Sequence, residues 1–169
     1  MVRIKYLRWI IVIIIIVIAG VLAWLYFSKT EEKKIKRQVD LLSEYASKES
    51  GENALIMANK IQSMKTLFAE SCEIEAENVP LSGSYTPDEI GSYAVQARLQ
   101  FSKLSLGFYD PEIKFPEKGF ARVSLTARVT GNYTTGESVD EAHELEVLLE
   151  KREKKYLFKS FTVTEVLKK

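Results

Sequence analysis

The stretch from Trp9 to Phe27 constrains this chain more than any other feature, because it is nearly all Ile, Val, Leu and Ala and carries no charge. An α-helix rises about 1.5 Å per residue, so about 20 apolar residues span the roughly 30 Å hydrocarbon core of a bilayer. We therefore expect a transmembrane helix over residues 9–28.

The residues at the two ends of this stretch support the same expectation. Trp9 lies near one end, and Trp24 and Tyr26 lie near the other. Amphipathic aromatic rings favour the headgroup regions on both sides of a membrane. Arg8 and Lys29 flank the apolar run with positive charge. We expect these five residues to hold the helix in the bilayer.

The head before the span is short and wholly basic. Residues 1–8 contain Arg3, Lys5 and Arg8 and no acid, which is typical of a signal-anchor or of a signal peptide that is not removed. A cleaved signal peptide has a shorter apolar core of about 7–15 residues, followed by small residues at the cleavage site. The nearest match, at residues 21–23, lies inside the apolar run. We therefore expect the anchor to be retained.

The direction of insertion is less constrained by charge. The positive-inside rule counts Lys and Arg near the span, and the far side has more of them than the head: Lys29, Lys33, Lys34, Lys36 and Arg37. That count alone favours a cytoplasmic domain or is a draw. The short basic head and the acids mixed among the far-side cations favour the opposite arrangement. We expect the head in the cytoplasm and the domain in the periplasm, at a bacterial inner membrane. The basic run could also attract anionic headgroups, but the intermixed acids favour a solvated helix face.

Composition excludes several classes of protein. The part after the span is about 140 residues, the usual size of one domain. It holds 21 basic and 23 acidic residues, a formal charge of −2, which gives no electrostatic footprint for nucleic acid. The lone cysteine, Cys72, rules out an internal disulfide, and a single histidine rules out a His cluster for metal. We identify no catalytic motif and expect no cofactor and no metal.

Two amphipathic helices are expected after the span. Thr30 is a suitable N-cap for a helix over residues 29–48, and Ile35, Val39, Leu42 and Ala46 form one apolar stripe. A second helix is expected over residues 53–70. Its expected apolar stripe is Met57, Ile61, Met64 and Phe68. Methionine can fill a core or form an adaptable binding surface, and the helical spacing favours the core.

A short strand is expected next, because apolar residues from Cys72 to Ala76 alternate with glutamates. Those glutamates are more typical of a solubilising face than of a cation site, and Cys72 is more typical of a buried small side chain than of a nucleophile. Thr86-Pro87-Asp88-Glu89 then forms a capping box at the start of another helix. Its expected stripe is Ile90, Ala94, Ala97 and Phe101.

From Leu104 onward the period changes to two, which predicts antiparallel strands. Residues 121–129 alternate apolar and polar, and residues 139–149 do the same after a turn-rich break. If these strands pair, Arg122 and Arg128 can meet glutamates across the ladder. Residues 151–155 form a charged hairpin tip before the last strand. The order of elements predicts an α+β domain.

The last hairpin, Lys154 to Val163, and the helix end at residues 67–70 that leads into the Cys72 strand resemble the nuclear transport factor 2-like superfamily. This superfamily includes SnoaL-like and ketosteroid isomerase-like domains, with a cystatin-like α+β roll. The resemblance covers most of residues 30–169. It implies a cone-shaped roll of helices packed on a curved antiparallel sheet, here in a single-pass membrane-anchored form.

The resemblance also implies where a site would lie. In enzymes of the superfamily an acid inside the cone acts as a base, and a Tyr or a protonated Asp stabilises an oxyanion. Glu141 and His143 share the apolar strand face and are the candidates for lining the cone. Tyr93 and Tyr109, with Tyr45, are oxyanion candidates by residue type only. No acid–base set can be assigned from the sequence.

Two functions follow as expectations. The first is a non-catalytic scaffold or accessory subunit of an envelope assembly, similar in its short head, single span, connecting helix and sheet domain to the bitopic scaffold subunit of type IV secretion. Its partners would be the lipid bilayer and other membrane or envelope proteins, and a homo-oligomer is left open. The alternative is a cone that binds or transforms a small apolar or lipid-derived molecule.

Overall fold

The computed structural model describes residues 2–76 and 82–167 of the 169-residue chain, with the backbone alone described for 2–12, 23–28 and 165–167. Contacts divide the chain into two compact units, residues 1–34 and 35–169. One helix, α1 (Val2–Ala46), contributes to both units. Its bounds differ from our expectation that Thr30 begins a new helix. The helix runs through Thr30 because residues 21–34 contain no glycine or proline to end it.

The first unit is the N-terminal part of α1. The side chains described there are those of residues 13–22 and 29–34. Within the residues described, the structure contains no helix that is long and apolar enough to cross a membrane. The large apolar side chains from residue 13 to residue 22 are all more than half exposed: Ile13, Ile14, Ile15, Ile16, Val17, Ile18, Val21 and Leu22.

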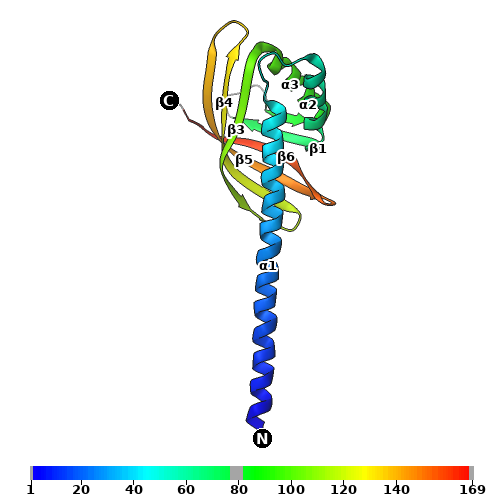
Figure 1. Ribbon diagram of the computed structural model, residues 1–169, viewed down its shortest axis with the longest axis vertical. Helices are drawn as coiled ribbons and strands as arrows, with labels where there is room; N and C mark the ends of the chain where they lie inside the picture. The colour runs from blue at the N-terminus through cyan, green and yellow to red at the C-terminus, as the bar shows by residue number, and fades with distance from the viewer. Residues whose placement is uncertain (1, 77–81, 168–169) are drawn as a thin grey trace. The chain divides into compact units, whose positions relative to one another are not determined.

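The second unit is an α+β domain, as expected. Its further elements are α2 (Ala54–Lys65), β1 (Phe68–Ala76), β2 (Gly83–Tyr85), α3 (Pro87–Gln100), β3 (Phe101–Lys114), β4 (Phe120–Tyr133), β5 (Ser138–Arg152) and β6 (Lys155–Leu167). The strands form one curved six-stranded sheet in the order β2-β1-β6-β5-β4-β3 (Figure 1). All neighbours are antiparallel except β1 and β6, which are parallel. The long hairpins β3–β4–β5–β6 make up most of the sheet.

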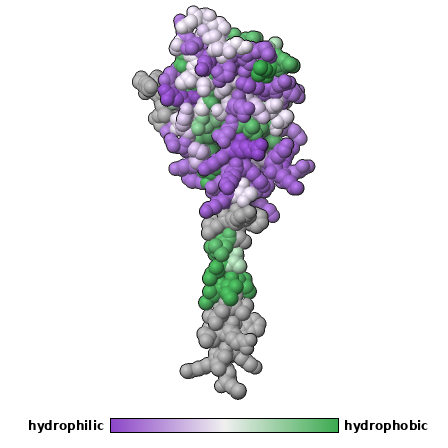
Figure 2. All heavy atoms as spheres, in the orientation of Figure 1, coloured by the Kyte–Doolittle hydropathy of each residue, from purple (hydrophilic) through white to green (hydrophobic). Residues whose placement is uncertain are grey.

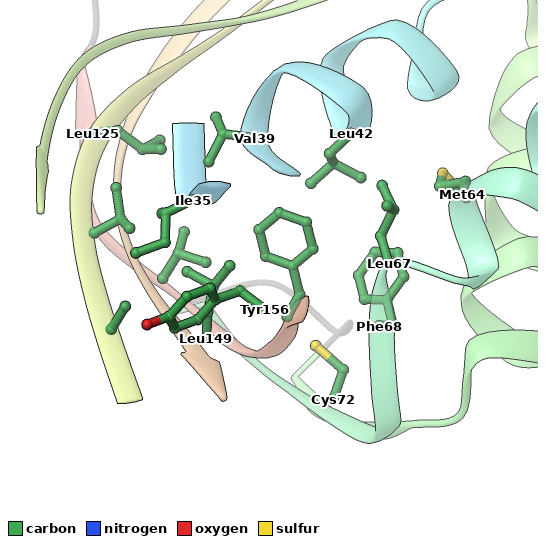
Figure 3. Close-up of a cluster of buried hydrophobic side chains, with 14 of the residues drawn as sticks. Ile35, Val39, Leu42, Met64, Leu67, Phe68, Cys72, Leu125, Leu149 and Tyr156 are labelled. Atoms are coloured by element: carbon green, nitrogen blue, oxygen red, sulfur yellow. The ribbon is translucent and has the colours of Figure 1, made fainter. Parts of the chain in front are cut away.

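The core lies between the sheet and the second half of α1. Ile35, Val39 and Leu42 are 0%, 4% and 6% exposed, so the expected apolar stripe is buried. Figure 3 shows these side chains directed toward residues of the sheet, among them Leu125 and Leu149. Burying each of them contributes on the order of 1.5–3 kcal/mol to folding. This packing fixes the second half of α1 as part of the domain.

The end of α1 is also joined to the edge strand β3. Lys48 and Leu104 exchange backbone hydrogen bonds of 2.7 and 3.0 Å. Ser43 donates its hydroxyl to the carbonyl of Leu106, and the Ser47 hydroxyl accepts from the Leu106 amide at 3.0 Å. These contacts satisfy backbone groups on part of β3 that has no neighbouring strand.

Two expected helix ends were wrong. α2 stops at Lys65 rather than near Glu70, and Phe68 already belongs to β1. Phe101 is the first residue of β3 rather than the last of the α3 stripe. Both phenylalanines are buried in the sheet, so an apolar residue at helical spacing was equally compatible with the start of a strand. The capping box at Thr86 and Glu89 is present as expected, with Pro87 at the helix start.

The strand patterns were read correctly. Ala121, Val123, Leu125 and Ala127 are all buried on one face of β4. The predicted pairing of Arg122 with a glutamate occurs, with 3.5 Å between Arg122 Nε and Glu146 Oε1. Arg128 instead holds Asp140 through two hydrogen bonds of 2.7 and 2.8 Å. Asp140 lies two residues along β5 from Ala142, the residue that pairs with Arg128. From there both of its carboxylate oxygens accept hydrogen bonds from the guanidinium.

Candidate functional site

The concave side of the sheet, where the resemblance places a ligand cavity, holds side chains of the protein itself. Ile35, Val39 and Leu42 of α1 pack there with a cluster from the sheet (Figure 3). The sheet residues of this cluster are apolar and buried: Phe68, Cys72, Ala121, Val123, Leu125, Ala127, Val147, Leu149, Tyr156 and Phe158. The packed part of the cone therefore works as a core.

Two of the candidate residues do come together. His143 Nε2 lies 3.4 Å from Glu141 Oε2 on β5, and the side chains are 27% and 64% exposed. Their cross-strand neighbours Ala127 and Val129 place them on the same face as the core. A carboxylate beside an imidazole can orient the ring through a hydrogen bond. The pair is thus a partly exposed polar group at the border of the core.

The tyrosine candidates do not join this pair. Tyr93 is 48% exposed on α3 and packs edge-on against Tyr85 of β2, with ring centroids 5.6 Å apart. Tyr109 is 52% exposed and pairs with Thr126, which places it on the opposite face of the sheet. Tyr45 is half-buried and packs against the core. The residues singled out by type therefore occupy separate parts of the domain.

A polar hollow of about 460 Å³ lies on the face of the sheet opposite the core. It forms where the two flanking strands are irregular: β3 bulges between Tyr109 and Glu112, with Asp110 at φ 52°, and β6 shifts register near Thr164. Bulges bend a sheet locally and re-aim side chains. The lining is mostly acidic and hydroxylic: Asp110, Glu112, Ser124, Leu125, Thr126, Glu144, Leu145, Glu146 and Thr164.

The hollow has the character of a polar surface rather than of a metal centre. Glu146 is paired with Arg122, and Thr164 donates to the carbonyl of Glu144 at 3.1 Å. Among the residues that the structure describes, no group of His, Cys, Asp and Glu side chains is arranged to hold a metal ion. The strand glutamates Glu73 and Glu75 are exposed, as expected for a solvated face, and Glu77 lies outside the described residues.

A buried charge cluster joins the helices, and the sequence analysis did not identify it. Arg98 of α3 is 1% exposed, and its Nη1 lies within 2.9 Å of the carbonyl oxygens of Tyr45, Ala46 and Ser47 at the end of α1. Its Nη2 donates to Glu52. Arg98 follows Ile90 and Ala94 at steps of four, so it lies in the apolar stripe of the helix. A charged residue in such a stripe was the sequence feature that could have indicated a buried ion pair.

Glu52 is the negative centre of this cluster. It accepts a second hydrogen bond from Lys60 at 2.9 Å and is 3% exposed. Burial alone would raise the pKa of Glu52, but the hydrogen bonds and charges of Lys60 and Arg98 outweigh burial, and the pKa lies below its ordinary value. The carboxylate is therefore ionised wherever the domain is folded at neutral pH.

Cys72 is a core residue. It is 0% exposed, and burial raises the pKa of its thiol to about 12. A thiol with so high a pKa has almost no thiolate at neutral pH and is a poor nucleophile. The sequence-based interpretation of a small buried side chain is correct.

The expected membrane residues lie mostly beyond what the structure describes. The side chains of Arg8, Trp9, Trp24 and Tyr26 are outside the described residues, and Lys29 is exposed. Figure 2 shows the apolar side chains of residues 13–22 at the surface of α1, and a second apolar area over α2 and α3. Exposed apolar side chains on those helices are Leu55, Ile56 and Leu99.

The sequence matches no protein-family model and no curated protein. Solved structures, in contrast, are similar over most of the chain. A candidate scytalone dehydratase from Novosphingobium aromaticivorans has a TM-score of 0.65 at 18% identity, covering 83% of this chain and 87% of that one. A hexachlorocyclohexane dehydrochlorinase from Novosphingobium barchaimii has a TM-score of 0.65 at 10% identity, covering 83% and 90%.

The chain has the nuclear transport factor 2-like fold. A candidate calcium/calmodulin-dependent protein kinase II association domain from Xanthomonas campestris is also similar, with a TM-score of 0.53 at 12% identity over 76% of this chain and 80% of that one. At such identities the nuclear transport factor 2-like fold is what is shared. Proteins named as enzymes and a protein named as an association domain both have it, so function has to be argued from the side chains.

Proposed function

We propose that this protein is a membrane-anchored, non-catalytic scaffold or accessory subunit of an envelope assembly, acting through protein–protein contacts. The observation that carries the proposal is the packing of Ile35, Val39 and Leu42 on the concave face of the sheet. These side chains occupy space that a ligand-binding cone would need. A domain filled in this way presents its outer surfaces rather than an interior.

Anchoring is proposed from α1. A helix that is apolar all round is stable either inside a protein core or inside a membrane. The large apolar side chains between residues 13 and 22 are more than half exposed, so the helix that carries them does not bury them by itself. The apolar run Trp9–Phe27 has the length of a span. We propose a single-pass topology at a bacterial inner membrane, with the head in the cytoplasm and the domain in the periplasm.

The test is crosslinking in intact membranes with tagged full-length protein, followed by mass spectrometry of the captured proteins. The scaffold proposal expects a reproducible set of membrane or envelope proteins, and their compartment reports the side on which the domain lies. The matched control replaces Ile15 and Ile18 by lysine, which removes the apolar character of the helix. Capture of the same set by this control would contradict a role for the anchor.

The alternative is a ligand-binding or enzymatic cone for a small apolar or lipid-derived molecule. The observation that favours it is the partly exposed pair His143 and Glu141, which lies on the core face of β5. Organic extraction of the purified full-length protein tests this alternative directly. A stoichiometric small molecule, lost in a His143→Ala variant, would support the cone and count against the scaffold.

A further inference from the structure

The ends of α1 and α3 are joined by two sets of hydrogen bonds, one from each side. Arg98, in the last turn of α3, holds the carbonyl oxygens of Tyr45, Ala46 and Ser47 at the end of α1. Lys48, two residues beyond α1, reaches the other way: its Nζ donates to Arg98 O at 2.9 Å and to Phe101 O at 2.6 Å. The Arg98 side chain thus caps the end of α1, just before Lys48, and the Lys48 side chain caps the end of α3, which carries Arg98.

The physical need for these caps comes from the helix ends. The last four carbonyl groups of an α-helix lack partners within the helix, and they carry the negative end of its dipole. Among the residues that the structure describes, the buried Nε of Arg98 has no hydrogen-bond partner, so the guanidinium acts through its two terminal nitrogens, on α1 and on Glu52. Lys60 adds a further donor to Ser47 O at 3.1 Å. The junction thus contains three cations, one carboxylate and two helix ends.

The contacts form a ring rather than a chain. From the end of α1, the path runs through the Lys48 side chain to the backbone of Arg98, and through the Arg98 side chain back to the end of α1. Loss of one arm leaves one helix end without its cap and the two ends linked by a single arm. Hydrogen-bonded networks of this kind are worth more together than the separate bonds suggest.

We propose that Lys48 and Arg98 form a two-way lock, through which the end of α1 and the end of α3 become ordered or loosened together. A change in the position of α1 thereby reaches α3, including Leu99, which is exposed beside Arg98. The lock uses only residues 45–101 of the folded unit. It therefore holds whether or not the proposed anchoring and scaffold function are correct.

The experiment is amide hydrogen exchange of the full-length protein in detergent micelles, read by mass spectrometry. The variants are Lys48→Met, Arg98→Met and the double variant, with Lys48→Arg and Arg98→Lys as conservative forms. Lys103→Met is the matched control, because Lys103 is an exposed cation 4.0 Å from Glu49 outside the ring. We expect each single variant to speed amide exchange about tenfold or more at both helix ends, residues 43–48 and 97–101. A helix end opens more often when its carbonyls lose a hydrogen bond from a charged group, and such a bond is worth at least that factor.

Exchange at the end of α1 is the decisive measurement for Lys48→Met, because within the described part of the chain the hydrogen bonds of the Lys48 ammonium go to the end of α3. Faster exchange at both ends, restored by Lys48→Arg and no greater in the double variant than in Arg98→Met, supports the lock. Faster exchange at the end of α3 alone, or additive effects in the double variant, would show two independent caps and overturn it. If Arg98→Met does not fold, Arg98→Lys and Lys48→Met make the same comparison.

Discussion

The buried carboxylate of Glu52 accepts a hydrogen bond from Arg98 Nη2, with the two side chains 3% and 1% exposed. This ion pair connects the loop before α2 to the last turn of α3. Taking both groups out of water is costly, and the cost is offset only because each has further hydrogen bonds, Glu52 to Lys60 and Arg98 to the end of α1. Loss of one partner is therefore expected to be strongly destabilising, because it leaves the other charge buried without its counterion.

We expect Glu52→Gln to lower the free energy of unfolding by about 3 kcal/mol, because it leaves the Arg98 guanidinium buried without a counterion. The matched control is Glu49→Gln, which removes an exposed carboxylate 4.0 Å from Lys103 and should change stability by less than about 0.5 kcal/mol. Urea denaturation of the full-length protein in micelles measures both. Equal effects of the two substitutions would contradict the structural role of Glu52.

The pH dependence of stability follows from the same group. The pKa of Glu52 is lowered in the folded protein from its ordinary value of 4.5. Its contribution is therefore fully present above that value and is lost as the pH falls through the lower folded pKa. We expect wild-type protein to lose stability more steeply than Glu52→Gln below about pH 4.5. Parallel curves of unfolding free energy against pH would show that Glu52 does not titrate with folding.

The buried stripe of α1 gives a test of its place in the core. Ile35 is 0% exposed, whereas its neighbour Lys36 is exposed. We expect Ile35→Ala to destabilise the domain by about 3 kcal/mol through lost burial and the cavity left behind, and Lys36→Ala to cost almost nothing. Thermal or urea unfolding distinguishes them. A negligible effect of Ile35→Ala would mean that α1 is not part of the core.

Gly131 and Gly91 allow a clash with backbone to be compared with a clash with a flexible side chain. A Cβ on Gly131 would lie 2.6 Å from the backbone oxygen of Lys103, while a Cβ on Gly91 would meet Lys65 Cδ at 2.8 Å, near the end of a flexible side chain. We expect Gly131→Ala to destabilise by about 1–3 kcal/mol because β3 has to move. Gly91→Ala should stay within about 1 kcal/mol, since alanine also favours the helix. The reverse ranking in unfolding measurements would contradict the register of β3 on β4.

Local signals predicted local structure well. The capping box at Thr86 and the alternation along β4 and β5 depend on residues close in sequence, and both were read correctly. The parallel pairing of β1 with β6 joins segments about 90 residues apart along the chain, and nothing in either strand specifies its partner. The break expected at Thr30 was wrong because a good N-cap residue ends no helix by itself.

The candidate site was harder to predict. Glu141 and His143 were placed correctly on one strand face, since strand alternation fixes that relationship. Tyr93 and Tyr109 were chosen by residue type, which carries no position, and they lie in different places. The outer hollow depends on bulges at Asp110 and near Thr164, and those arise from the register of whole strands. Arg98 was missed because its place in an apolar stripe was the only local signal, and its partners, three backbone carbonyls and Glu52, cannot be identified from the sequence.

The most direct test of the central proposal is whether α1 holds the protein in a membrane. Membranes containing the full-length protein are washed at alkaline pH, and the pellet and supernatant are compared with those of a variant carrying Ile15→Lys and Ile18→Lys. Each lysine at the centre of a span costs about 2.5–3.5 kcal/mol, and the Ile15→Leu, Ile18→Leu form is the matched control. We expect wild-type and the leucine form in the pellet and the lysine form in the supernatant. Wild-type protein in the supernatant would contradict membrane anchoring.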